Sequence, residues 1–205
     1  MSLEITQEDL NNIEAAKAAG GDIWNHQLVS TFKDKVKTYY REIQNEQCCY
    51  CRKNFEGEFK MVIDIEHILP KGTFENLMFT DYNLNVACKR CNMNVKGVKT
   101  DFVTDLNAVK ANPQDRTLYK IIHPNFDDYF SHLKFLTVIE NQYKLIKYQI
   151  VIDSAKGQFT YDYFRLKELE VDTLNQAQGL KEKEELSSKI PDNVAKRIND
   201  NLEKL

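Results

Sequence analysis

The sequence contains few residues that interrupt regular structure and no long apolar segment. Only 7 glycines and 4 prolines occur among its 205 residues, and we find neither an internal repeat nor a low-complexity segment. No stretch approaches the roughly 18 uncharged apolar residues that a membrane span requires, and residues 1–9 are acidic without an apolar signal region. These absences predict a cytoplasmic protein with no membrane contact, built as one domain with at most a small appendage.

An excess of positive charge is absent as well. The chain has 28 Lys and Arg against 31 Asp and Glu, which gives a formal net charge of -3. Hydrophobic residues make up 42%, which suffices for a folded core and argues against wholesale disorder. Overall charge would not attract a nucleic acid, so such a substrate would need a local basic patch or a partner protein.

Cysteine is missing from every part of the chain except residues 48–91, where all 5 cysteines fall. Cys48 with Cys51, and Cys88 with Cys91, form two Cys-x2-Cys pairs. Each pair can present two thiolates to one ion from a tight turn, and two pairs complete a tetrahedral Zn²⁺ shell. Because protein ligands fill that shell, we predict a structural Zn²⁺ held by these four cysteines.

Two alternatives to this zinc site remain open. Cys49 offers a further thiol, but a single residue separates it from Cys51, so we assign it to packing or to a spare thiol. A redox function would need only one Cys-x2-Cys pair in a βαβ context, whereas this sequence has two such pairs. Reduced thiols clustered in a cytoplasmic chain favour metal binding over disulfide pairing.

A second group of chemically active residues lies between the two cysteine pairs. Glu66 and His67 are adjacent within residues 64–72. A carboxylate is a hard ligand for a divalent cation, and an imidazole can take a proton from water near neutral pH. An isolated Glu-His pair is most often a surface feature, but its place between two zinc-binding pairs favours a site that cuts phosphodiesters.

Residues Cys48–Gly97 resemble the HNH endonuclease motif in its zinc-stapled form. The resemblance implies an α+β fold with a ββα-metal core, in which His67 is the general base. It also implies that Glu66 and Asn92 bind one catalytic Mg²⁺ or Mn²⁺ and that Asn83 orients the loop carrying the base. Two departures bear on the preferred metal, since Glu66 stands where Asp is usual and Asn92 where His is frequent.

A longer pattern is similar to the HNH nuclease subunits of Septu-type and retron-linked anti-phage systems. It comprises Ile65-Glu66-His67, Pro70-Lys71, Asn83-Leu84 and the Asn that follows the second cysteine pair. This resemblance implies a nucleic-acid substrate, with DNA favoured over RNA, and an ATPase partner subunit. Such a partner would suit a nuclease whose own net charge is negative.

Basic residues gather around the second cysteine pair. Residues 82–100 contain no acidic residue, and one further lysine follows the Glu-His pair. We therefore assign phosphate contacts to these cations in preference to a merely solvated surface: Lys71, Lys89, Arg90, Lys96 and Lys99.

We divide the chain into three parts: a helical segment 1–46, the nuclease core that the resemblance implies over 47–110, and an α+β and helical region 111–205. Apolar spacing predicts helices over 6–19 and 22–46, a strand over 59–65, a turn over 83–87 and a brief helix over 92–97. Further on it predicts a helix over 127–136, strands over 136–140, 143–153 and 158–164, and two C-terminal helices over 166–180 and 190–202.

One further residue pair and two alternative functions remain to be considered. Asp128 and His132 have the spacing of a second metal site, but no third ligand is evident in residues 123–132, so capping and packing are favoured. A catalytically silent zinc module would explain the cysteines and lysines but not the Glu66, His67, Asn83 and Asn92 set. An adaptor acting through the C-terminal helices is the remaining alternative.

Overall fold

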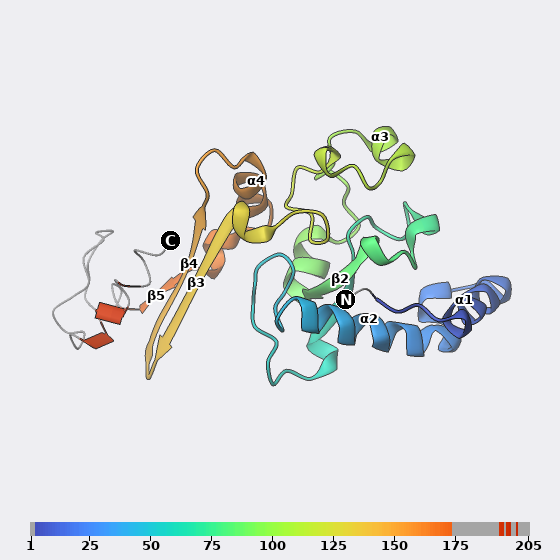
Figure 1. Cartoon of the computed structure of the whole chain (residues 1–205), viewed down its shortest axis with the longest axis horizontal. Coiled ribbons are helices and arrows are strands. Elements are labelled where there is room, and N and C mark those ends of the chain that lie inside the picture. The colour runs from blue at the N-terminus through green and yellow to red at the C-terminus, as the bar shows by residue number, and fades with distance from the viewer. Residues whose placement is uncertain (1–2, 174–192, 195, 198–199, 201–205) are drawn as a thin grey trace. The chain divides into compact units, whose positions relative to one another are not determined.

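The computed structural model describes residues 3–173, 193–194, 196–197 and 200, which form two compact units, Met1–Asp127 and Asp128–Leu205 (Figure 1). Helices and small antiparallel sheets occur together, so the predicted α+β class is confirmed. No helix in the described part of the chain is both long and apolar enough to cross a lipid bilayer.

The first unit begins with α1 (Gln7–Ala19). Thr6 caps it by accepting the backbone N–H of Asp9, while the Asp9 carboxylate accepts the backbone N–H of Thr6 in return. The Asp9 carboxylate also pairs with Lys35 at 2.6 Å, which ties α1 to the next helix.

The prediction of a single helix over 22–46 is wrong. Asp22 accepts the N–H of Asn25 and so caps only a 3-10 turn (η1, Ile23–Asn25), and a second turn precedes α2 (Ser30–Ile43). The face of α2 that carries Phe32 and Val36 is buried, and the helix contacts both strands of the sheet described next.

The centre of the first unit is a two-stranded antiparallel sheet of β1 (Ile63–His67) and β2 (Leu84–Cys88). It leads into η6 (Arg90–Lys96), a short wide helix that Gly97 N–H closes on the carbonyl of Asn92 at 2.7 Å. This β-β-helix order agrees with the core that the motif predicted, and it brings His67 beside Leu84 in the register.

Two predictions in this region, one of a strand and one of a turn, need correction. The strand expected over 59–65 begins only at Ile63, because residues 60–62 form a 3-10 turn and Phe59 is 64% exposed. The turn expected over 83–87 is mostly strand β2. Asparagines made it look turn-like, but Asn83 and Asn85 are buried and hydrogen-bonded in the interior.

The second unit is a long hairpin of β3 (Leu133–Glu140) and β4 (Tyr143–Ile150), with a short third strand, β5 (Val171–Asp172), beside β4 (Figure 1). A hairpin at this place was predicted and is confirmed. The turn uses Asn141 at φ 52°, a left-handed conformation that asparagine tolerates well.

The other predictions for the second unit are wrong where they can be compared. Of residues 127–136, only 129–131 form a 3-10 turn and 133–136 already belong to β3, while residues 158–164 belong mostly to helix α4 (Ala155–Tyr163). Ser154 caps α4, and Phe159 stacks on Tyr163 at 5.6 Å, so the aromatic spacing is that of a helix rather than of a strand.

The first C-terminal helix does not begin where it was expected. Residues 166–169 form a 3-10 turn that leads into β5, and the rest of the predicted helix over 166–180 lies beyond the described residues. The second predicted helix, over 190–202, also lies largely outside them.

Candidate metal centre and active-site cleft

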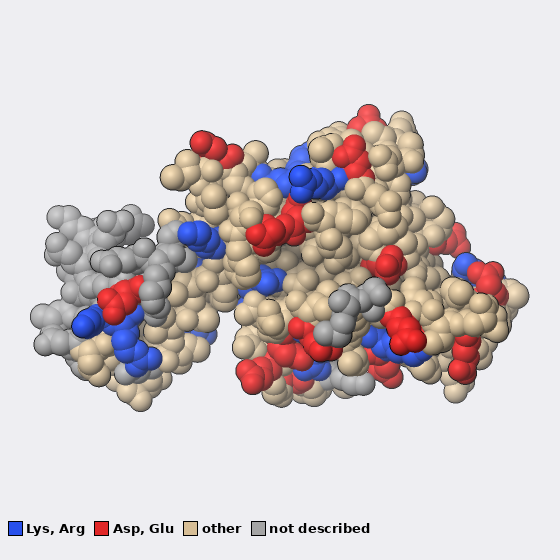
Figure 2. Space-filling view, in the orientation of Figure 1, with Lys and Arg blue, Asp and Glu red and all other residues tan. Residues whose placement is uncertain are grey.

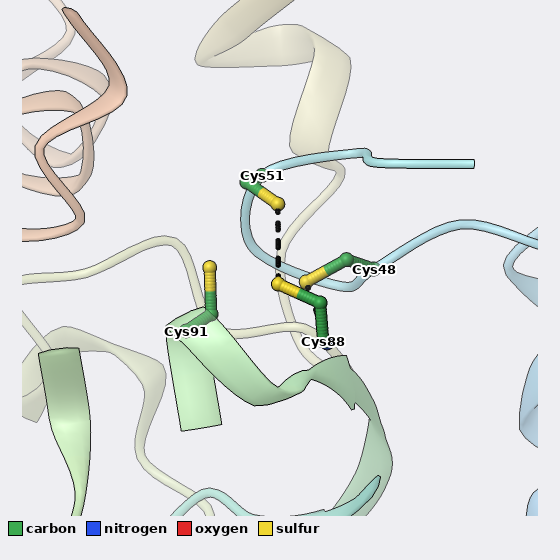
Figure 3. A group of neighbouring side chains, drawn as sticks. All are labelled: Cys48, Cys51, Cys88 and Cys91. Atoms are coloured by element: carbon green, nitrogen blue, oxygen red, sulfur yellow. Dashed lines mark hydrogen bonds between the residues drawn. The ribbon is translucent and has the colours of Figure 1, made fainter. Parts of the chain in front are cut away.

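Four sulfur atoms from two separate segments converge in the interior of the first unit (Figure 3). Cys48 and Cys51 lie on the loop after α2, Cys88 ends β2, and Cys91 lies in η6. All four residues are buried, and their Sγ atoms lie within 4.8 Å of one another. The two pairs that the spacing predicted therefore meet in one cluster.

The dimensions of this cluster fit a zinc ion. Sulfurs in a tetrahedral shell with Zn–S bonds of about 2.3 Å are about 3.8 Å apart. The Sγ atoms of Cys51 and Cys88 are 3.7 Å apart. The backbone N–H of Cys88 donates to Sγ of Cys48 at 3.3 Å, a contact that stabilises a thiolate. The cluster could hold one zinc ion with every position filled by protein.

Cys49 takes no part in this cluster. Its backbone N–H donates to the carbonyl of Val86 at 3.1 Å, which fastens the cysteine loop to β2. Burial raises the pKa of its thiol, so the side chain stays protonated and packs as a small apolar group. Packing was one of the two roles expected for it.

Buried Glu66 on β1 accepts a hydrogen bond from the cysteine loop and forms an ion pair with η6. Tyr50, between the two ligands of the first pair, donates its hydroxyl to Oε1 of Glu66 at 3.0 Å. The same oxygen lies 2.7 Å from Nζ of Lys96, and the two side chains are 0% and 2% exposed. Burial raises the pKa of Glu66, although the Lys96 charge opposes the shift. Lys96 also donates to the carbonyl of His67 at 2.8 Å, so the pair supports the backbone at the end of β1.

Glu66→Gln is expected to lower the free energy of unfolding by roughly 3–5 kcal/mol, because it leaves the buried Lys96 charge without its partner. Urea denaturation at saturating zinc measures the change. Lys96→Met should cost a similar amount, and the double variant should lose less than the sum of the two single losses. Additive losses would show that the two side chains do not stabilise each other.

The tautomer of His67 follows from its surroundings. Its Nε2 lies 3.0 Å from the carbonyl oxygen of Met78, and since a carbonyl only accepts, Nε2 carries the proton. Nδ1 is then the nitrogen with the free lone pair. Burial lowers the pKa of His67 to about 4, which keeps the ring neutral at pH 7, and Trp24 packs edge-on against it at 4.3 Å. A fixed, neutral imidazole can accept a proton at Nδ1.

Asn83 connects the loop after β1 to the start of β2. Its Oδ1 accepts the backbone N–H of Leu69 at 2.7 Å, and its Nδ2 donates to the carbonyls of Leu69 and Leu77 at 3.1 Å each. Its own carbonyl accepts the N–H of Ile68. These contacts restrain the residues that directly follow His67, as a loop-orienting role would require.

A cleft of about 600 Å³ opens beside His67, and we call it the His67 cleft. Its lining includes Lys33, Lys37, Asp64, His67, Lys71 and Asn92. Asn92 Nδ2 donates to Oδ2 of Asp64 at 3.1 Å, whereas Glu66 is fully buried. The carboxylate that shares the cleft with Asn92 is therefore Asp64, which sequence reasoning missed because Glu66 is adjacent to His67.

The five cations predicted to contact phosphate lie in different settings. Lys96 is buried, Lys89 pairs with Asp64 at 2.8 Å, and Lys99 donates to the carbonyl of Val95 at 2.7 Å. Arg90 is half-buried, and Lys71 lines the His67 cleft. Acidic and basic side chains are interspersed over the face that Figure 2 shows, in keeping with the small net charge.

The second metal site that was considered for Asp128 and His132 is not formed in the described residues. Asp128 caps the turn before β3 by accepting the N–H of Phe130, while His132 Nδ1 contacts the Ser154 hydroxyl at 2.8 Å. Within the described residues, the four-cysteine cluster is the only group of three or more His, Cys, Asp and Glu side chains close enough together to bind a metal. The favoured capping and packing interpretation therefore agrees with these contacts.

Comparison with known proteins yields one informative similarity. Over 167 residues, or 82% of the chain, the sequence is 28% identical to a Septu protein PtuB of Bacillus thuringiensis. The alignment covers 49% of that relative, so the chain spans about half of its length. No protein-family model matches the chain, and no solved structure matches it. The similarity supports the Septu part of the resemblance drawn from the motifs.

Proposed function

We propose that this chain is a divalent-cation-dependent HNH endonuclease that hydrolyses phosphodiester bonds of nucleic acid. The observation that carries the proposal is the placement of the neutral His67 ring, with Nε2 bonded to Met78, in the same cleft as Asp64 and Asn92. This arrangement places a proton acceptor in the same cleft as side-chain oxygen atoms, which are the metal ligands that Mg²⁺ and Mn²⁺ prefer.

The donor set supports a particular choice of ligands for the catalytic ion. Asp64 and Asn92 would hold it, since their oxygen-bearing side chains already meet in the His67 cleft. When bound, the ion would stabilise charge on the scissile phosphate and on the leaving 3′ oxygen. Glu66, the ligand implied by the resemblance, retains one carboxylate oxygen without a hydrogen-bond partner in the described structure, so it remains the competing candidate.

The protein's own residues perform the remaining steps. His67 Nδ1 takes a proton from the attacking water, and its bond to the Met78 carbonyl keeps the ring in the orientation that this requires. Asn83 holds the loop that follows the base, and the Lys96 contact fixes the His67 carbonyl. Lys71 contributes positive charge beside the reacting phosphate.

The biological setting belongs to the same proposal. The similarity to a Septu protein supports a role in anti-phage defence, and the motif resemblance adds an ATPase partner. A net charge of -3 supports the need for such a partner, because the isolated chain has little overall attraction for nucleic acid. DNA is the favoured substrate.

Cleavage by the purified chain, alone and with a co-purified partner, tests the proposal. We expect Mg²⁺- or Mn²⁺-dependent nicking of plasmid DNA, with structured RNA as the competing substrate. Asp64→Asn should raise the metal concentration needed for half-maximal cleavage and leave stability nearly unchanged. If Glu66→Gln raises it instead and remains stable, Glu66 is the ligand, and if neither substrate is cut under any condition, the nuclease proposal fails.

A further inference from the structure

The His67 cleft has a wall that the nuclease motif does not supply. Trp24 and the lysines at 33 and 37 come from the segment before the first cysteine pair, yet they line the same cleft as His67. Lys33 and Lys37 are four residues apart on α2, so their side chains leave the helix on one face, one turn apart. The helix contacts β1, and both lysines line the cleft that His67, the last residue of that strand, also lines.

Two hydrogen bonds hold the ammonium group of Lys33 in place, and neither of them is to a negatively charged group. Its Nζ donates to the carbonyl of Trp24 at 3.3 Å and to Oδ1 of Asn25 at 3.2 Å, and both acceptors are neutral. Its Nζ also lies 5.1 Å from the centroid of the Trp24 ring, which orients the side chain further. The same Trp24 ring packs against His67, so one residue positions both the cation and the imidazole.

Positive charges accumulate on this wall. Burial lowers the pKa of Lys33, and the charge of Lys71 lowers it further, while Asp22 and Asp34 act in the opposite direction. Burial also lowers the pKa of Lys37, with Lys33 and Lys89 adding to the shift and Asp64 and Asp34 opposing it. Partly buried cations that repel one another are stabilised when an anion enters between them.

We infer that Lys33, Lys37 and Lys71 form a phosphate cradle that holds the sugar-phosphate backbone of a nucleic-acid strand beside His67. The inference rests on the proposed nuclease function for its choice of ligand. It assigns part of the substrate-binding surface to the N-terminal helical segment. The α2 cations thus take a role that the charge pattern of residues 82–100 had assigned to Lys96, which is buried, and to Lys99, which donates to a backbone carbonyl.

Salt-dependent binding of fluorescent oligonucleotides tests the cradle. All measurements use the His67→Ala background, so that cleavage does not interfere with equilibrium binding. Lys33→Gln with Lys37→Gln should weaken binding to single- and double-stranded oligonucleotides of unrelated sequence. It should also reduce the slope of log affinity against log salt by about 1 for each lysine removed.

The matched control removes the same charge from the same unit outside the cleft. Lys17 on α1 and Lys110 on α3 (Leu106–Ala111) are both exposed, so Lys17→Gln with Lys110→Gln should leave affinity and slope close to the background values. If the two double variants behave alike, or if the background protein shows no binding, the cradle is wrong. If binding depends on Lys33 and Lys37 but the wild-type chain cuts nothing, the cradle stands and the nuclease proposal falls.

Discussion

Cys88→Ser is expected to abolish the folded state of the unit that contains residues 3–127, not merely its activity. Zinc binding at a four-thiolate site contributes about 10 kcal/mol or more to folding, while a typical domain has only about 5–15 kcal/mol of net stability. The four sulfurs come from the loop after α2 and from the consecutive β2 and η6, so the ion would cross-link two segments that are distant in the sequence.

Zinc content, far-UV circular dichroism and the thermal midpoint measure this outcome. Cys49→Ala is the matched control, because Cys49 is buried on the same loop but stands outside the cluster. That variant should keep its zinc and lose only the modest stability of a small packing defect. A soluble, zinc-free Cys88→Ser protein with an unchanged midpoint would refute the four-cysteine assignment.

His67→Ala is expected to reduce cleavage by roughly 10²- to 10⁴-fold, the usual contribution of general base catalysis. Zinc content, fold and oligonucleotide binding should remain, since the proposed role is to accept a proton. Single-turnover rates measure the effect directly. His67→Gln provides a second variant that better preserves volume beside Trp24 and can still donate to the Met78 carbonyl.

Metal dependence separates this variant from the ligand variants. Raised Mg²⁺ or Mn²⁺ should partly restore cleavage by Asp64→Asn, but should not restore His67→Ala, which lacks the proton acceptor. His26→Ala is the control, because the His26 ring accepts the N–H of Leu28 in a turn before α2 and is not among the residues that line the His67 cleft. Wild-type cleavage by His67→Ala, or equal rescue of both variants by metal, would show that His67 is not the general base.

The elements that the sequence predicted well depend on local signals. Two Cys-x2-Cys pairs require two tight turns, and their meeting in space follows from ligand chemistry. Helix α1 follows Thr6, a residue type that commonly caps helices. The β3–β4 hairpin turns at Asn141, a residue type that tolerates positive φ. In each case a few neighbouring residues contain the physical reason for the structure.

The elements that were missed depend on distant partners. Glu66 is withdrawn from the cleft because Lys96, from η6, reaches it in the interior, and one sequence alone does not reveal such a pairing. Lys33 joins the cleft only through the way α2 packs on the sheet. Helix α4 is an exception, because its signal is local: its closely spaced aromatic residues suit either a strand or a helix, and the Ser154 cap favours the helix.

The direct succession of Cys91 and Asn92 has a consequence for how this chain tolerates insertions and deletions. One residue is anchored among the sulfurs while the next faces the cleft, so an inserted residue between them would rotate everything downstream by about a quarter to a third of a helical turn. The amide would swing away from Asp64. Residues 56–58 lie between the same cysteine pairs but on an exposed turn, where length variation displaces no anchored side chain. Natural or engineered length changes should therefore accumulate in that turn and be excluded from the Cys91-Asn92 junction.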